Sequence, residues 1–211
     1  MSETKKRSLS FFFLWFFVVS ISIYAAILLG FVWSKVYIKN ESLYGDGPFF
    51  NSIVYVLILI GLFAGYGQRI VLDTKLKKTH DWISRYWFPA TFIGFPVGCF
   101  VSLFIFFFAG DRLFKIGSTL LPHVDFGTVA IFAMLLLVGM ITGVFQWLSL
   151  KWELRGCHKW SLVSGLSLTI GGLPLVILPI DYMIVSVFIS IALGTAISGF
   201  FVESLIVNEA K

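Results

Sequence analysis

The segment GLFAGYGQRIVLDTKLKKTHDWISRYWFPATFIGFP, residues 61–96, decides the fold, because a related segment follows it in the same chain. The second segment, GMITGVFQWLSLKWELRGCHKWSLVSGLSLTIGGLP, occupies residues 139–174 and aligns at an offset of 78 positions without a gap. The identical pairs are Gly61/Gly139, Gly65/Gly143, Gln68/Gln146, Leu72/Leu150, Leu76/Leu154, His80/His158, Trp82/Trp160, Thr91/Thr169, Gly94/Gly172 and Pro96/Pro174. Each copy has the end of one apolar helix, a basic loop and the start of the next helix. The pattern predicts a duplicated helical hairpin.

The composition places these hairpins in a membrane. The chain has 211 residues, of which 58% are hydrophobic and 13% charged, whereas a soluble domain has about 25% charged residues. Six apolar runs approach or exceed the roughly 20 residues that a membrane-spanning helix needs, at about 9–34, 49–72, 87–110, 126–150, 161–180 and 182–206. Helices satisfy their own backbone groups in lipid. We therefore expect an all-α bundle of six transmembrane helices in one integral membrane domain, 1–211, with repeats at about 49–110 and 126–188.

The basic residues predict the orientation of the bundle. With the N terminus inside, only Lys35, Lys39, Arg112 and Lys115 of the 16 Lys and Arg residues lie outside, and basic residues favour cytoplasmic loops. Both termini are therefore expected in the cytoplasm. The same rule explains the net charge of +5 without a nucleic-acid partner. The basic inner loops should instead contact anionic headgroups of membrane lipids, or another membrane subunit.

The first apolar run follows Lys5, Lys6 and Arg7, as a signal peptide would, but it is longer than the 7–15 apolar residues of a signal. We interpret it as an uncleaved first span. Its Ser22, Ala26 and Gly30 form a stripe of small residues that lets helices approach closely.

The repeated glutamines, Gln68 and Gln146, are the sharpest candidate site residues. Each lies about one turn from the inner end of its helix, where an unpaired amide would cost several kcal/mol. Because each repeat has two spans, both copies face the same way, as in parallel repeats. One interpretation is a hydrogen bond to the loop backbone or between repeats; the other is a pair of amides that holds a polar headgroup or solute.

The repeated histidines, His80 and His158, lie in the two inner loops. No Cys or carboxylate recurs with them at a ligand spacing, so we expect no metal site and no cofactor. The loops are better explained as interfacial, because Trp anchors at headgroup depth and basic side chains contact anionic lipid. The expected inner anchors are Trp82, Trp160, Trp147, Trp152, Lys77 and Arg155.

Glycine and proline interrupt spans 3 and 5 at matching places, including Pro96 and Pro174. Matching interruptions in two repeats point to a transporter-type binding site. A kink shared by both hairpins, which helps them pack, explains the same pattern.

The sequence contains no Gly-x-Ser-x-Gly, His-Glu-x-x-His or phosphate-loop motif. The leading hypothesis is a non-enzymatic membrane protein that binds a lipid or small amphipathic ligand, or serves as a subunit of a larger membrane complex. The alternative is a solute-binding transport subunit with an outer site at Tyr44, Asp46, Asp111, Arg112 and Asp125. A second alternative is an intramembrane enzyme, for which His80, His158 and Glu203 are the only candidates.

The stretch Gly143-Val-Phe-Gln146-Trp147-Leu148-Ser-Leu150, followed by Trp160, resembles uncharacterised multi-pass bacterial proteins with Gly-x-x-Gln-Trp-x-x-Leu repeats. Arg69 replaces the Trp in the first copy. The resemblance implies the architecture and a bacterial plasma membrane, and it implies no activity. The six spans and inner termini also look like the substrate-binding subunits of energy-coupling-factor vitamin transporters, which would imply docking through the small-residue stripe of span 1.

Overall fold

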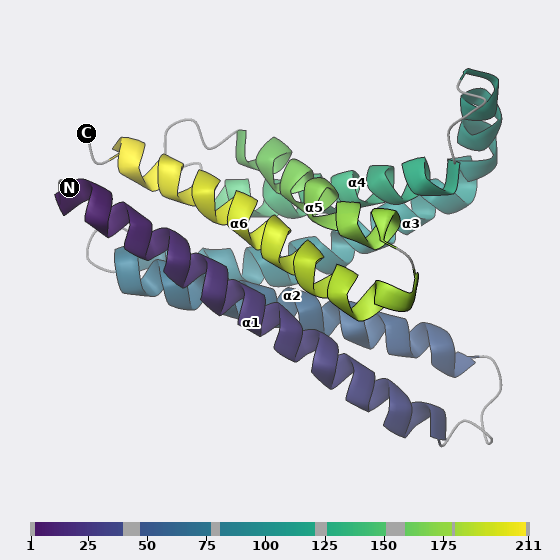
Figure 1. The fold of residues 1–211 in the computed structure, drawn as a ribbon, viewed down its shortest axis with the longest axis horizontal. Helices are drawn as coiled ribbons and strands as arrows, with labels where there is room; N and C mark the ends of the chain where they lie inside the picture. Colours follow the sequence, from purple (N-terminus) through teal and green to yellow (C-terminus); the bar gives the residue numbers. More distant parts are fainter. Residues whose placement is uncertain are drawn as a thin grey trace.

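The computed structural model describes residues 3–39, 47–76, 81–120, 126–150, 159–178 and 180–209. Apart from Leu178, this part of the chain is helical (Figure 1). The elements are α1 (Glu3–Lys39), α2 (Gly47–Leu76), α3 (Asp81–Leu120), α4 (Phe126–Leu150), α5 (Trp160–Ile177), the short 3-10 helix η3 (Ile180–Tyr182) and α6 (Met183–Glu209). The all-α prediction, with one helix for each apolar run, is confirmed.

Five of the helices are long and apolar enough to cross a membrane: Ser10–Gly30, Tyr55–Thr74, Arg85–Gly110, Val129–Ser149 and Met183–Ser204. The fifth predicted span, 161–180, is shorter than expected. Its helix ends at Ile177, and its apolar part covers only Trp160–Leu175, about 24 Å at the helical rise against about 30 Å of hydrocarbon. Pro174 lies in its last turn, where the missing backbone donor weakens the helix.

Helix α3 departs most from its predicted bounds. It continues through Pro89 and Pro96 and ends at Leu120, so the predicted interruption is absent and the helix extends ten residues beyond the predicted end of the span at 110. The end of α3 turns away from the bundle (Figure 1). Pro96 removes the donor that would bond to the Phe92 carbonyl. That carbonyl lies against Gly61 of α2, 3.4 Å from where a Cβ would be.

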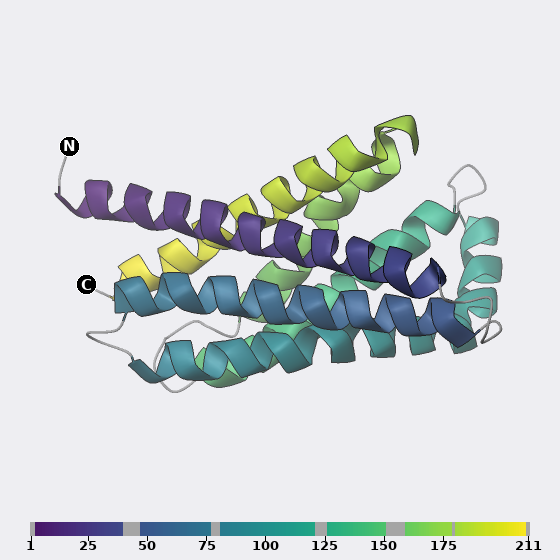
Figure 2. The ribbon, with the colours of Figure 1, turned by 90° about the horizontal axis from the view of Figure 1, so that it is seen from below.

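The six helices form a closed ring. Each helix packs on the next one in the chain, and α6 packs back on α1. The first turn of α1 and the last turn of α6 lie at the same end of the bundle (Figures 1 and 2). We call this the terminal end. The helices lie closer together there than at the opposite end, where they diverge (Figure 1).

Glycines bring neighbouring helices together. A Cβ on Gly139 of α4 would lie 2.6 Å from the Cα of Gly165 and from the backbone oxygen of Ser164, both on α5. Likewise, a Cβ on Gly171 of α5 would lie 3.0 Å from the Cα of Gly194 of α6. Small residues at such crossings give van der Waals contact between backbones, which stabilises helix pairs in lipid.

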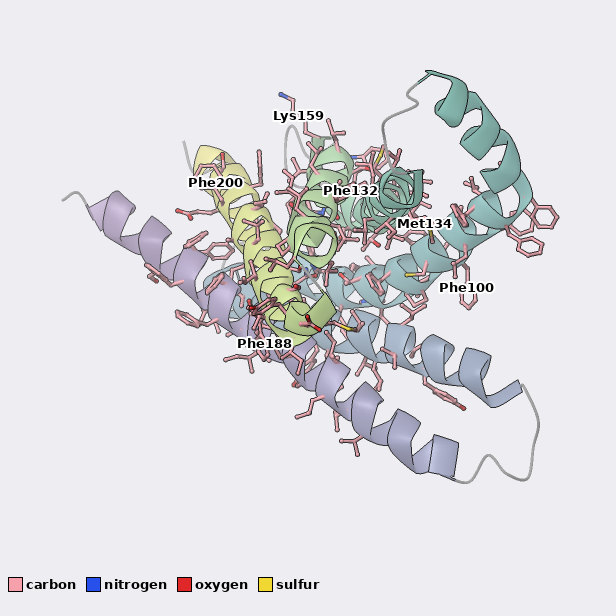
Figure 3. The ribbon with its side chains drawn as sticks, turned by 45° about the vertical axis from the view of Figure 1, so that its right-hand side comes forward. Phe100, Phe132, Met134, Lys159, Phe188 and Phe200 are labelled. Carbon is pink, nitrogen blue, oxygen red and sulfur yellow. The ribbon has the colours of Figure 1, made fainter. Side chains whose placement is uncertain are left out.

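Large apolar side chains cover the outside of the bundle, as expected for a surface that faces lipid. Phe107 is 83% exposed and Phe200 63% exposed. Phe100 and Phe200, which are labelled in Figure 3, lie on the outer surface. The buried cluster instead gathers at the terminal end, around Trp15, Trp87 and Trp160.

Candidate functional site

The structure brings the two repeated glutamines into contact. The Gln146 Nε2 group donates to Gln68 Oε1 at 3.2 Å. The indole N–H of Trp87 donates to the same Gln68 oxygen at 2.7 Å, and the indole N–H of Trp160 donates to Gln146 Oε1 at 2.7 Å. Four helices, α2 to α5, thus meet in one polar contact. We call these residues, with Thr91, the glutamine–tryptophan layer.

The two indoles fix the orientation of both amides. An indole nitrogen can only donate a hydrogen bond, so the amide atom facing Trp87 or Trp160 is an oxygen. The amide nitrogen of Gln146 therefore faces Gln68 and Thr91, and it donates to Thr91 Oγ1 at 2.7 Å. Both N–H groups of Gln146 are then used within the layer, and its side chain is only 2% exposed. The geometry makes Gln146 a link between helices.

Thr91 completes the layer from α3. Its hydroxyl lies 3.0 Å from Gln68 Oε1 and 3.0 Å from the backbone oxygen of Trp87. A hydroxyl has one proton, so it donates to one of these oxygens while it accepts from Gln146. The corresponding Thr169 instead donates to the backbone oxygen of Gly165 on its own helix. The layer therefore contains only one of the two repeated threonines.

The tryptophan that contacts Gln68 was missed by the repeat alignment. The alignment pairs Trp82 with Trp160, yet Trp87 is the residue that donates to Gln68. The available signal was helical spacing, since Trp87 lies four residues before Thr91 and therefore on the same face of α3. Trp82 lies in the first turn of α3, and its side chain lies outside the described residues.

A third buried tryptophan has an equivalent contact. Trp15 of α1 donates its indole N–H to the Ser198 hydroxyl of α6 at 3.2 Å. Its ring centre lies 6.3 Å from that of Trp87, which lies 5.5 Å from that of Trp160. Each of the three indoles thus bonds to the helix that precedes its own in the ring. A buried indole needs a partner for its N–H, but the sequence analysis did not single out Trp15, because its burial follows only from the packing of the helices.

A cavity of about 350 Å³ runs along the axis of the ring. All six helices line it, and its lining on α5 extends from Trp160 to Leu175, about 22 Å at the helical rise. At its terminal end lie Gln68, Gln146 and Trp160 of the glutamine–tryptophan layer. The side walls are mainly apolar, and the lining residues that the structure describes include no charged side chain. The cavity falls within the size range of small-molecule sites.

Two serine hydroxyls in the cavity wall have no hydrogen-bond partner within the structure: Ser167 of α5 and Ser190 of α6. The side chains are only 4% and 8% exposed. Leaving a buried hydroxyl unpaired costs about 1–3 kcal/mol. Ser102 of α3 is also buried and unpaired, but it does not line this cavity. Ser167 and Ser190 thus combine a place in the cavity wall with a buried hydroxyl that has no partner among the described residues.

Most of the other predicted site residues, or their side chains, lie outside the part of the chain that the structure describes. The structure does not describe Tyr44, Asp46, Lys77, His80, Asp125, Trp152, Arg155 and His158. Asp111 and Arg112 lie on α3, with side chains outside the described residues. Trp147 is half-buried and packs against the buried cluster. Among the described residues, no group of three His, Cys, Asp or Glu side chains could hold a metal ion.

Charged groups also occur at the terminal end. Arg69 and Asp73 form an ion pair of 3.5 Å in the last two turns of α2. Lys159, directly before α5, is exposed and points away from the bundle (Figure 3).

No protein-family model, no curated protein and no solved structure matches the chain.

Proposed function

We propose that this protein is a non-enzymatic membrane protein that binds a lipid or another small amphipathic molecule in its central cavity. The observation that carries the proposal is a cavity lined by all six helices, with Gln68, Gln146 and Trp160 of the glutamine–tryptophan layer among its lining residues. Its walls suit an apolar chain, because burial of apolar surface favours binding by about 25 cal/mol per Å².

The glutamines take a structural part in this proposal. Both N–H groups of Gln146 are used by Gln68 and Thr91, and its oxygen accepts from Trp160. The interpretation that Gln146 joins the two hairpins by hydrogen bonds therefore has more support than the interpretation that it binds a lipid headgroup. In this proposal the layer closes the cavity toward the terminal end. A molecule would then enter from the diverging end or between helices, which favours binding over passage through the ring.

The proposed architecture is a ring of three hairpins. Helices α2 and α3 form the first copy, α4 and α5 the second, and α6 with α1 a third that is split between the ends of the chain. Supporting this, each pair contains one indole bond, from Trp87 to Gln68, from Trp160 to Gln146 and from Trp15 to Ser198. The third pair has Ser198 where the others have glutamine as acceptor.

The proposed orientation places the terminal end in the cytoplasm. The basic inner loops favour this side. The exposed Lys159 and the Arg69–Asp73 pair lie at that end, where charged side chains reach the headgroup region. The bacterial plasma membrane is part of the same proposal and rests on the sequence resemblance alone.

The alternative functions have less support from the cavity. A solute-binding transport subunit would place its site among Tyr44, Asp46, Asp111, Arg112 and Asp125, whose side chains the structure does not describe. An intramembrane enzyme would need a base or a nucleophile with its base at the cavity. The lining consists of apolar, hydroxyl and amide side chains with the Trp160 indole, which suits binding.

A pair of variants tests the proposal. Leu168 lines the cavity, while Leu166 on the same helix is 43% exposed to the outside. Leu168→Trp would fill the cavity, and Leu166→Trp would change only the outer surface. Native mass spectrometry of the gently solubilised proteins should show a co-purifying molecule on the wild type and on Leu166→Trp, and its loss from Leu168→Trp. Equal retention by both variants would place the molecule elsewhere and reject the proposal.

A further inference from the structure

The hydroxyl groups of this bundle fall into two kinds. Most of those buried in helices donate to a backbone oxygen one turn earlier, which is the usual arrangement in membrane helices. These bonds are Ser22 to Val18, Thr142 to Val138, Thr169 to Gly165, Ser186 to Tyr182 and Thr195 to Ile191. Ser167 and Ser190 make no such bond, although both are more than nine-tenths buried. Both residues line the cavity, and their buried hydroxyls have no hydrogen-bond partner among the described residues.

The two serines lie on either side of one helix crossing. Gly171 of α5 meets Gly194 of α6, and a Cβ at Gly171 would lie 3.0 Å from the backbone oxygen of Ser190. A Cβ at Gly194 would lie 3.3 Å from the backbone oxygen of Ser167. Because α5 and α6 run in opposite directions, the serines are about one helical turn apart along the cavity. Two residues with unpaired hydroxyls therefore lie beside one stretch of an otherwise apolar cavity.

The remaining lining restricts the charge of a ligand. No Lys, Arg, His, Asp or Glu is among the lining residues that the structure describes. An ionised group placed between apolar walls would lose its hydration without gaining an opposite charge, and such burial is strongly unfavourable. A neutral oxygen has no such cost, because it can accept a hydrogen bond from a serine hydroxyl.

From the proposed function and these two serines, we infer that the ligand is a neutral hydrocarbon chain carrying an oxygen group, which Ser167 and Ser190 hold by hydrogen bonds. An alcohol or an ester provides this chemistry, so a free single-chain lipid and a neutral glycerolipid are both sources of it. The chain lies along the apolar walls, and the oxygen lies at the depth of the Gly171–Gly194 crossing.

The test uses four probes of equal chain length with the full protein in lipid nanodiscs: dodecan-1-ol, dodecane, dodecanoate and dodecylammonium. We expect the wild type to bind dodecan-1-ol about tenfold more tightly than the other three, which corresponds to one net hydrogen bond. Binding is measured by native mass spectrometry after release from the nanodiscs. A methyl dodecanoate arm reports whether an ester oxygen is accepted as well as a hydroxyl, and the mass of any co-purified molecule distinguishes a single-chain lipid from a glycerolipid.

The variants separate this inference from the proposed function. Combined Ser167→Ala and Ser190→Ala should abolish the preference for dodecan-1-ol and leave dodecane binding unchanged. Ser102→Ala removes an unpaired buried hydroxyl outside the cavity, and it should keep the preference. If wild-type protein binds dodecane as tightly as dodecan-1-ol, or if the double variant keeps the preference, the serine assignment is wrong while the cavity still binds. If no probe binds and Leu168→Trp changes nothing, the proposed function itself fails.

Discussion

The indole of Trp15, near the start of the chain, donates to the hydroxyl of Ser198, near its end, across 3.2 Å. Two further bonds continue this seam between α1 and α6: the Ser20 and Thr195 hydroxyls lie 2.8 Å apart, and the Tyr24 hydroxyl donates to the Phe188 backbone oxygen at 2.7 Å. These contacts close the ring of helices, because α6 packs on both α5 and α1. The cavity depends on this closure.

Loss of the Ser198 hydroxyl should loosen the closure. Ser198→Ala leaves the buried N–H of Trp15 without its partner, and we expect the free energy of unfolding to fall by about 1–2 kcal/mol. Ser186→Ala is the matched control, because its hydroxyl bonds to the backbone oxygen of Tyr182, one turn earlier in the chain, and not to another helix of the ring. The measurement is reversible unfolding in detergent or bicelles. Equal stability of the two variants would mean that the Trp15 bond does not stabilise the bundle.

The two glutamines should behave as one unit. Gln146→Ala removes the donor to Gln68 and Thr91 and the acceptor for Trp160, so we expect a loss of about 2–4 kcal/mol. Gln68→Ala should also destabilise the protein. The double variant should lose less than the sum of the single variants, with a coupling energy of about 0.5–3 kcal/mol. Strictly additive losses would show that the amide–amide contact contributes nothing.

The structure and the repeat alignment disagree about which tryptophan of α3 matters, and a substitution pair decides between them. Trp87→Phe keeps most of the apolar contact but removes the N–H that bonds to Gln68. We expect it to lower the free energy of unfolding by about 1 kcal/mol, and Trp82→Phe to have a smaller effect. The comparison uses the same unfolding assay. A larger loss for Trp82→Phe would support the partner that the alignment indicated.

The α4–α5 crossing should not tolerate a methyl group. A Cβ at Gly139 would lie 2.6 Å from the backbone of both Gly165 and Ser164, where neither neighbour can rotate away. We expect Gly139→Ala to separate α4 from α5 and to destabilise the protein by about 1–3 kcal/mol. Gly110→Ala is the control, since the nearest atoms would lie 3.9 Å away. If both substitutions are neutral, the two backbones are not in contact at this crossing.

The proposed orientation is open to a direct measurement. A green fluorescent protein fused after Lys211 should fluoresce, and alkaline phosphatase fused there should be inactive, because both termini are proposed to face the cytoplasm. The same pair of reporters placed in the segment 121–125 should give the opposite readings. Active phosphatase at the C terminus would reverse the orientation without changing the helix packing.

Part of the site could be predicted from the sequence because the bilayer imposes strong local constraints. An amide such as Gln146 near the end of an apolar helix must find a partner, and its repetition as Gln68 marks both residues. Helix bounds were less predictable. Pro96 does not interrupt α3, and α5 ends at Ile177, short of the predicted end at 180. A proline costs one backbone bond, and packing against neighbouring helices decides whether the helix continues.

The sequence by itself determined the six apolar helices, because apolar composition in lipid leaves the backbone no other solution than helices or a closed barrel. It also singled out the two glutamines. Only the tertiary structure decided that Trp87 and not Trp82 bonds to Gln68, that Trp15 reaches Ser198, and that Ser167 and Ser190 face a cavity without partners. These relationships depend on how each helix is rotated about its axis and on how the two ends of the chain meet. A pattern along one helix fixes neither, since both result from packing between residues far apart in the sequence.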